Sequence, residues 1–252
     1  MIHFVGAGCG AKDLITVRGK EHIEKADVIV YAGSLVNPEL LEYNKKSAKI
    51  YDSAYMTLDE VIDVLKNSEE KELYTVRLHT GDPSMYGAIK EQMDILADFD
   101  IDYDITPGVS AAFGAAASLK AEYTLPEVSQ TLILTRMSGK TLVPEKESIK
   151  SLAAHDATMA IYLSASLSDK LQQELLEGGY SENTPAAVCV KVSWEDEKIY
   201  RCTVGTIDKT TKDNNIKKTC IYIIGESINP EKYDKSRLYA ADFSTEYRKA
   251  KE

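Results

Sequence analysis

The sequence has few of the features that mark special classes of protein. Its four cysteines form no CxxC pair, and their spacing matches no zinc-binding pattern. The longest nearly apolar run, 111–119, is far shorter than the roughly 20 residues of a membrane-spanning helix. The first residues contain no basic segment followed by an apolar stretch, so we expect no signal peptide. These absences predict reduced thiols and a cytoplasmic protein.

Basic residues are outnumbered. The chain has 30 lysines and arginines against 40 aspartates and glutamates, which gives a net charge of −10. A surface of this sign repels phosphate backbones and anionic lipids, so we expect neither nucleic acid nor a membrane as a partner. With 252 residues, 44% of them hydrophobic, the chain is long enough for one or two domains, each with its own core.

Strand-like apolar runs alternate with helical segments in the first half. The segment 57–66 has an apolar stripe at helical spacing, and Thr57 with Glu60 fits a capping box at its start. This alternation is typical of βαβ units and predicts a mostly parallel sheet in an N-terminal α/β domain, residues 1–119. Strands are expected at 2–5, 27–31, 74–80 and 102–106.

The pattern changes after about residue 128. One clear helix is expected there, 168–177, ended by Gly178-Gly179. The last three predicted strands follow one another without a long helix, which favours antiparallel pairing. A mixed sheet is therefore predicted in a second α/β domain, 129–228, followed by a polar tail, 229–252. Strands are expected at 131–136, 158–164, 186–194, 199–204 and 219–225.

Three short motifs are incomplete. The turn 6–11 fits the relaxed dinucleotide fingerprint, but no acidic residue ends the second strand, as ribose binding requires. The segment 138–141 ends like a phosphate-binding loop, yet Leu134 stands where that loop needs glycine. Ser110 resembles a nucleophile elbow, but Ala112 replaces the closing glycine. We therefore interpret 6–11 as a glycine-rich turn beside a ligand cleft, 138–141 as a surface turn, and Ser110 as the start of a helix.

The four histidines, at positions 3, 22, 79 and 155, show no metal-binding spacing. We interpret them as structural or surface residues and expect no protein-bound metal.

Two glycine turns follow predicted strands and are more informative. In 77–87 a strand ends at Gly81, and Asp82 followed by Pro83 fits the cap and first position of a helix. The turn 106–110 follows the next strand in the same way. The carboxyl ends of parallel strands are where α/β proteins bind ligands, so these two turns are predicted to form one wall of a small-molecule site.

These segments resemble the tetrapyrrole (corrin/porphyrin) methyltransferase family over about residues 2–227. The likeness lies in the first glycine-rich turn, the Gly81-Asp82-Pro83 turn, the 107–110 turn, and Leu125-Pro126 with Gln130. Four stretches, 31–36, 77–87, 124–130 and 152–155, resemble the branch that methylates C11 of precorrin-4 or cobalt-precorrin-4 in cobalamin biosynthesis.

The resemblance implies a two-domain α/β architecture, a homodimer, a tetrapyrrole substrate and S-adenosylmethionine as methyl donor. It implies that cofactor contacts come mostly from backbone atoms. By position, the cofactor-binding residues would be Cys9, Gly81, Asp82, Met85, Ser110, Ala111 and Leu163. Basic groups for the substrate carboxylates could come from Arg18, Arg77, Arg136 or Lys140.

The first turn departs from the family pattern GxGPGD. Cys9 replaces the proline and Ala11 replaces the aspartate, which in relatives could act as a base or orient a group. No catalytic residue is therefore assigned. Three alternatives stay open: another corrin or porphyrin position; a translation factor or ribosomal RNA as substrate; or an oxidoreductase or binding-only module. The negative charge argues against RNA, and the missing acidic residue argues against the oxidoreductase.

Overall fold

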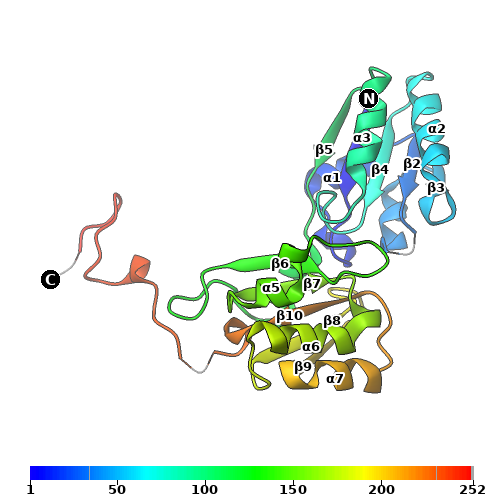
Figure 1. Ribbon diagram of the computed structural model, residues 1–252. Helices are drawn as coiled ribbons and strands as arrows, with labels where there is room; N and C mark the ends of the chain where they lie inside the picture. Colours follow the sequence, from blue (N-terminus) through cyan, green and yellow to red (C-terminus); the bar gives the residue numbers. More distant parts are fainter. Residues whose placement is uncertain (34, 231, 251–252) are drawn as a thin grey trace. The chain divides into compact units, whose positions relative to one another are not determined.

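A computed structural model describes residues 1–33, 35–230 and 232–250 (Figure 1). The chain divides into two compact units. The first is Met1–Ala115 with Lys191–Lys198, and the second is Ala116–Val190 with Ile199–Glu252. The domain limits expected from the sequence, 1–119, 129–228 and 229–252, stay a prediction. Ser34, in one family-like stretch, and positions 231 and 251–252 of the predicted tail lie outside the described residues.

The first unit is built on a fully parallel sheet of five strands in the order β3-β2-β4-β1-β5. The mostly parallel sheet predicted for this half is thereby confirmed, and a strand that was not predicted, β3, forms one edge. The strands are β1 (Ile2–Gly6), β2 (Val28–Tyr31), β3 (Lys49–Asp52), β4 (Thr75–His79) and β5 (Tyr103–Thr106).

Helices cover both faces of this sheet. On one face, α2 (Leu58–Glu69) and α3 (Ile89–Asp98) pack on a cluster that includes Phe4. On the other face, α1 (Val17–Lys25) and the 3-10 helix η2 (Pro38–Tyr43) pack on a cluster that includes Leu78. Thr57 and Glu60 form the predicted capping box of α2. The next helix, α4 (Ala111–Leu119), begins directly after Ser110, as predicted.

The strand order places a switch point between β1 and β4. The connection from β1 runs toward β2 and β3, whereas the connection from β4 runs past β1 to β5, in the opposite direction along the sheet. In open parallel sheets, ligands bind beyond the carboxyl ends of the strands at such a point. The turns after Gly6 and His79 lie there.

The second unit contains the predicted mixed sheet, in the order β6-β7-β10-β8-β9. The pair β6–β7 is parallel, and β10 is antiparallel to both β7 and β8. The core includes Met159, Leu171 and Tyr222. The strands are β6 (Leu132–Arg136), β7 (Thr158–Tyr162), β8 (Pro185–Val190), β9 (Lys198–Thr203) and β10 (Cys220–Ile224).

Two predictions for this unit need correction. The strand expected over 186–194 ends at Val190, because Lys191 and Ser193 adopt a left-handed backbone that an extended strand excludes. Helix α6 (Ser168–Gly178) ends at Gly179 with φ +121°, as predicted, but it is not the sole helix. The structure adds α5 (Ile149–Ala153) and α7 (Ile207–Asp213), the latter between β9 and β10.

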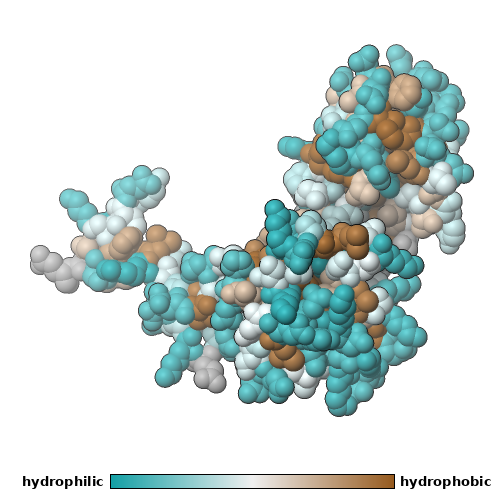
Figure 2. Space-filling model, viewed as in Figure 1, coloured by the Kyte–Doolittle hydropathy of each residue, from teal (hydrophilic) through white to brown (hydrophobic). Residues whose placement is uncertain are grey.

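Hydrophilic residues cover most of the surface that Figure 2 shows over α6 and α7. Within the described part, no helix is long and apolar enough to cross a membrane. In the tail, the Arg248 guanidinium donates hydrogen bonds to the carbonyls of Leu238, Ala240 and Phe243. The remaining 3-10 elements are η1 (Lys12–Leu14), η3 (Ser53–Tyr55), η4 (Glu145–Glu147), η5 (Ala165–Leu167), η6 (Val204–Thr206), η7 (Glu226–Ile228) and η8 (Arg237–Tyr239).

Candidate functional site

Three glycine turns interlock at the switch point of the first unit. A Cβ atom built on Gly6 would lie 2.6 Å from the Cα of Gly108, and one on Gly108 would lie 2.1 Å from the carbonyl oxygen of Gly81. Both distances are far inside van der Waals contact, so the backbones can approach this closely because side chains are absent. The predicted pairing of the turns after β4 and β5 is confirmed, and the turn after β1 joins them.

Hydrogen bonds fix the first turn against the second. The amide of Ala7 donates to the His79 carbonyl at 2.7 Å, and Gly8 and Gly81 exchange two backbone bonds of 3.2 and 2.8 Å. Gly8 has φ +80° and Gly81 has φ +60°, a left-handed conformation that favours glycine. These bonds hold the backbone at the ends of β1 and β4 together.

The carboxylate of Asp82 ties the second turn to the third. Its Oδ2 accepts a 2.9 Å bond from the Gly108 amide, and its Oδ1 accepts bonds from the amide and hydroxyl of Ser84. Burial disfavours the charged carboxylate, but the bonds from Ser84 and Gly108 outweigh it, so the pKa of Asp82 is lowered. Asp82 is therefore ionised at neutral pH.

The helix predicted to start at Asp82 and Pro83 is not present. Residues 83–86 form turns, and α3 begins at Ile89. Asp82 does accept the amide of Ser84, as a cap would, but its other oxygen accepts Gly108 from a different strand end, and Tyr86 and Ala88 have positive φ. A helix cannot run through those two left-handed residues.

Six of the seven predicted cofactor residues belong to these turns. Cys9 and Ser110 are buried, and Met85 is half-buried, with its amide bonded to the Asp82 carbonyl. A Cβ on Gly81 would meet no atom closer than 3.7 Å, and the nearest atoms belong to Ser110, Val109 and Ala111. Unlike at Gly6 and Gly108, a Cβ at Gly81 would make only ordinary van der Waals contacts, and it is the φ of +60° that favours glycine there. Of the predicted residues, Ser110 and Ala111 lie nearest to this position.

Leu163, the seventh, belongs to the second unit. It follows the last residue of β7, is 66% exposed, and has φ +53°. A left-handed conformation is uncommon for a non-glycine residue. Core packing does not account for such a residue, and its role in cofactor binding stays a prediction.

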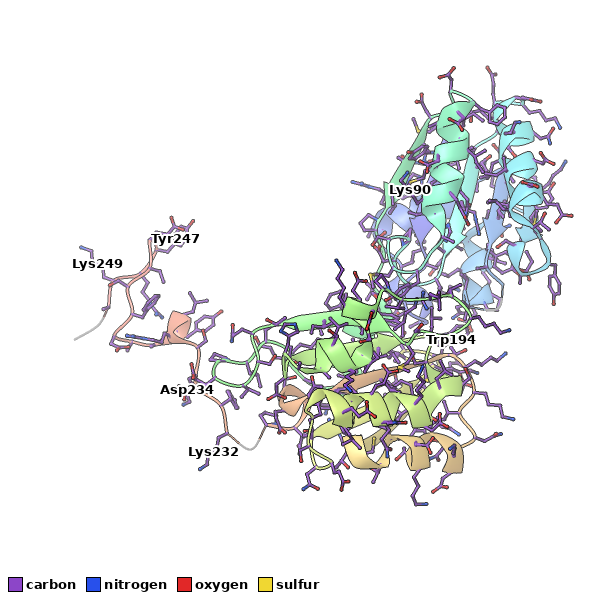
Figure 3. All side chains as sticks on the ribbon, viewed as in Figure 1. Lys90, Trp194, Lys232, Asp234, Tyr247 and Lys249 are labelled. Atoms are coloured by element: carbon purple, nitrogen blue, oxygen red, sulfur yellow. The ribbon has the colours of Figure 1, made fainter. Side chains whose placement is uncertain are left out.

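One segment beside these turns, the loop 191–198, carries no pattern from which its position could be predicted. Its Ser193 hydroxyl accepts a 2.9 Å bond from the Ala11 amide and is hydrogen-bonded at 3.3 Å to the Cys9 thiol. Trp194, labelled in Figure 3, packs so closely that a Cβ on Gly10 would lie 2.3 Å from its ring. A segment far along the chain thus covers the first glycine turn.

The loop is braced within itself. The Ser193 amide donates to a carboxylate oxygen of Glu197 at 2.6 Å, and backbone bonds link Trp194 to Lys191 and Glu197 to Trp194. Ser193 keeps a φ of +64°, an uncommon conformation for serine. The bracing holds the Ser193 hydroxyl where it meets Cys9 and Ala11, the two positions that depart from the family pattern.

Two of the four basic residues considered for the substrate carboxylates, Arg77 and Arg136, are hydrogen-bonded within the protein. The Arg77 guanidinium is 6% exposed and donates to Gln92 and to the Val30 carbonyl, and burial lowers its pKa to about 10. Arg136 donates to three backbone carbonyls nearby in the chain. Both guanidinium groups therefore support the backbone around them, Arg77 in the first unit and Arg136 in the second.

His79 is buried and uncharged. It is 4% exposed, its Nε2 has no hydrogen-bond partner among the described residues, and its ring stacks on Phe4. Burial, and then the charge of Arg77, lower its pKa to about 3. At that pKa the imidazole is a weak base, so His79 is not suited to removing a proton from a substrate at neutral pH.

We expect His79 to make the protein sensitive to acid. Its folded pKa lies below the roughly 6.5 of an unfolded histidine, so the unfolded chain takes up the extra proton as the pH falls. When the pH falls from 7 to 5, the unfolding free energy of the parent protein should decrease. In His79→Gln this decrease should be smaller by about 2 kcal/mol. Urea unfolding at the two pH values measures this, and His155→Gln, at an exposed position, is the control. Equal losses in all three proteins would contradict the assignment.

The fold and the turns define an α/β protein in which three interlocked glycine turns lie at the switch point of a parallel sheet, the place where open parallel sheets bind ligands. The family model of the Tetrapyrrole (Corrin/Porphyrin) Methylases matches residues 1–208. The chain therefore belongs to this family, as the resemblance of its turns implied, and the two-sheet architecture expected from that resemblance is confirmed.

Individual relatives extend the match to nearly the whole chain. A cobalt-precorrin-4 C(11)-methyltransferase from Methanocaldococcus jannaschii is 57% identical over 98% of this chain and 95% of its own length. The X-ray structure of a cobalt-precorrin-4 methyltransferase of cobalamin biosynthesis has a TM-score of 0.89 and 42% identity, covering 91% of this chain and 96% of the other. A uroporphyrin-III C-methyltransferase from Thermus thermophilus, solved with S-adenosylhomocysteine, shares the fold at 18% identity, with a TM-score of 0.74 over 90% and 93% of the chains.

Proposed function

We propose that this protein transfers a methyl group from S-adenosylmethionine to C11 of cobalt-precorrin-4 in cobalamin biosynthesis. The main support for this proposal is a relative named for that reaction, which is 57% identical to this chain over nearly the full length of both. The structural likeness to a cobalt-precorrin-4 methyltransferase, at 42% identity, supports the same substrate.

The glycine turns suit a cofactor held through the backbone. The carbonyl of Val109 and the amide of Ala111 lie 3.9 and 4.0 Å from the position that a Cβ of Gly81 would take. Because Gly81 has no side chain, a ligand can approach its backbone and these two groups. We assign the cofactor contacts to Cys9, Gly81, Asp82, Met85, Ser110, Ala111 and Leu163.

When bound, S-adenosylmethionine supplies a methyl group on a sulfonium, which is already a good leaving group. The task left to this chain is to hold the acceptor carbon and the methyl group in line, and such positioning contributes about 7–11 kcal/mol to rate enhancement. The interlocked turns serve this task because their geometry is fixed by backbone contacts. The Asp82 carboxylate maintains that geometry by bonding Gly108 and Ser84.

Ser193 should contribute to cofactor affinity without touching the cofactor. Ser193→Ala removes the acceptor of the Ala11 amide and the partner of the Cys9 thiol, so the first turn loses its support. We expect the dissociation constant for S-adenosylhomocysteine, measured by calorimetry, to rise about five- to tenfold. Ser151→Ala, at an exposed position in α5, is the matched control. Unchanged affinity in Ser193→Ala would show that the loop does not support the turn.

Mass spectrometry tests the reaction. The protein is incubated with S-adenosylmethionine and cobalt-precorrin-4, and a parallel sample contains metal-free precorrin-4. We expect the mass of cobalt-precorrin-4 to increase by one methyl group. In control samples without the protein, neither substrate should gain mass. If S-adenosylhomocysteine binds but neither substrate gains mass, the corrin assignment is wrong, although the cofactor assignment stands.

The family resemblance also implies a homodimer, which we propose for this chain. Light scattering during size-exclusion chromatography should then give twice the 27.9 kDa of one chain. A mass of one chain at micromolar concentration would contradict the dimer.

A further inference from the structure

Two histidines and an aspartate meet at the other end of the first sheet, away from the glycine turns. His3 lies near the start of β1, Asp104 near the start of β5, and the strand register pairs them directly. His22 reaches the same point from α1. One ring nitrogen of each histidine and one carboxylate oxygen of Asp104 all lie within 4.8 Å of one another. Three elements thus bring three metal-binding groups together.

The spacing of these groups is close to that of ligands on a single ion. The His3 Nδ1 and the Asp104 Oδ1 are 2.9 Å apart, and the rings of His3 and His22 have centroids 4.4 Å apart at an angle of 32°. Around a zinc ion bound tetrahedrally at about 2.0–2.1 Å, neighbouring ligand atoms lie about 3.3 Å apart and imidazole centres about 5.2 Å apart. Shifts of less than about 1 Å would complete the arrangement.

A further residue orients one of the imidazoles. The Tyr74 hydroxyl lies 2.7 Å from the Nδ1 of His22. With that nitrogen donating to the hydroxyl, the Nε2 of His22 keeps its lone pair for a metal. Ligating histidines in metal sites are held by an oxygen partner in this way.

The cluster is accessible in spite of its burial. His3 and His22 are only 6% and 9% exposed, but the side chain of Asp104 is 46% exposed. A cavity of about 800 Å³ opens onto His3 and Tyr74. Four carboxylates line it against two lysines and the amino terminus, an excess that favours the entry of a cation. The acidic residues are Glu24, Asp27, Glu69 and Glu72.

We propose that His3, His22 and Asp104 bind one divalent transition-metal ion, and that this ion is zinc. Two neutral imidazoles and one carboxylate form a donor set that zinc binds well, with water in the fourth position. Such an ion would join β1, β5 and α1 and so stabilise the first unit. The site is separate from the glycine turns, and it revises the interpretation of His3 and His22 as merely structural residues.

Zinc titration of the full-length protein tests the proposal. Metal-free protein competes for Zn²⁺ with a chromophoric chelator, which gives the stoichiometry and the affinity. We expect one zinc ion per chain. Asp104→Asn should weaken binding about 10-fold or more, and His22→Gln about 100-fold. His155→Gln, at an exposed position outside the cluster, should bind as the parent protein does.

A second measurement identifies the ligands independently of these variants. Cobalt(II) added in place of zinc should give the visible absorption of a site of low coordination number without a thiolate charge-transfer band. Because the Asp104 side chain is largely exposed, Asp104→Asn should fold even if His22→Gln does not, and circular dichroism checks both. The proposal would be overturned if the parent protein binds no zinc, or if Asp104→Asn binds zinc as tightly as the parent. A thiolate band in the cobalt(II) spectrum would also overturn it.

Discussion

Gly108→Ala is expected to destabilise the first unit by about 3 kcal/mol and to weaken S-adenosylhomocysteine binding at least about 100-fold. The added methyl group would lie 2.1 Å from the Gly81 carbonyl oxygen and 2.8 Å from the Cα of Gly6. Both neighbours are backbone atoms of other strand ends, so neither can yield as a flexible side chain would. Urea unfolding and calorimetry measure the two effects separately.

Gly139→Ala is the control for this experiment. A Cβ at Gly139 meets only the end of the Leu167 side chain, at 3.4 Å, which is ordinary contact. This variant should unfold and bind as the parent protein does. If Gly108→Ala behaves like Gly139→Ala in both measurements, the interlocking of the three turns has no energetic importance. If Gly108→Ala loses stability but keeps its affinity for S-adenosylhomocysteine, the turns do interlock, but the cofactor binds elsewhere.

Asp82→Ala should weaken S-adenosylhomocysteine binding by about 10- to 100-fold and cost about 1–3 kcal/mol of stability. It removes the acceptor for the Gly108 and Ser84 amides at once, so the second and third turns lose their link. Because hydrogen bonding lowers the pKa of Asp82, its stabilising effect is present above the ordinary carboxyl pKa and disappears as the pH falls through the lowered value. Calorimetry at neutral pH measures the affinity.

Two variants sharpen the test of Asp82. Asp82→Asn retains one acceptor oxygen and should recover part of the lost affinity. Asp98→Ala removes an exposed aspartate at the end of α3 in the same unit and should have little effect. Equal affinities for Asp82→Ala and Asp98→Ala would mean that the link to Gly108 plays no part in binding.

The sequence predicted those elements whose local signals are strong. The capping box of α2 and the three buried strands β1, β2 and β4 have strong local patterns. Both edge strands have mostly exposed or half-buried residues, and of these β5 was predicted because the glycine turn 106–110 follows it, whereas β3 (Lys49–Asp52) has no such turn after it. In α1, Gly19 and several charged residues weaken the helical signal. In α3, by contrast, Ile89, Met93 and Leu96 repeat at helical spacing and could have revealed the helix.

The meeting of the glycine turns could be predicted because each of these turns follows a strand of the parallel sheet. Gly81, Asp82 and Ser110 follow strand ends, and parallel strands bring those ends together. The contribution of Ser193 and Trp194 could not be predicted, because no pattern in a single sequence links residue 193 to residue 9. The helix expected at Asp82 does not form because Tyr86 and Ala88 adopt a left-handed backbone, which their residue types do not indicate.

The position of the transferred methyl group tests the central claim most directly. The protein is given S-adenosylmethionine labelled with ¹³C in its methyl group and cobalt-precorrin-4, and the labelled carbon of the product is located by NMR. The proposed function predicts a single label, attached to C11. A label on another ring carbon would contradict the C11 assignment, and a product without label would contradict methyl transfer to this substrate altogether.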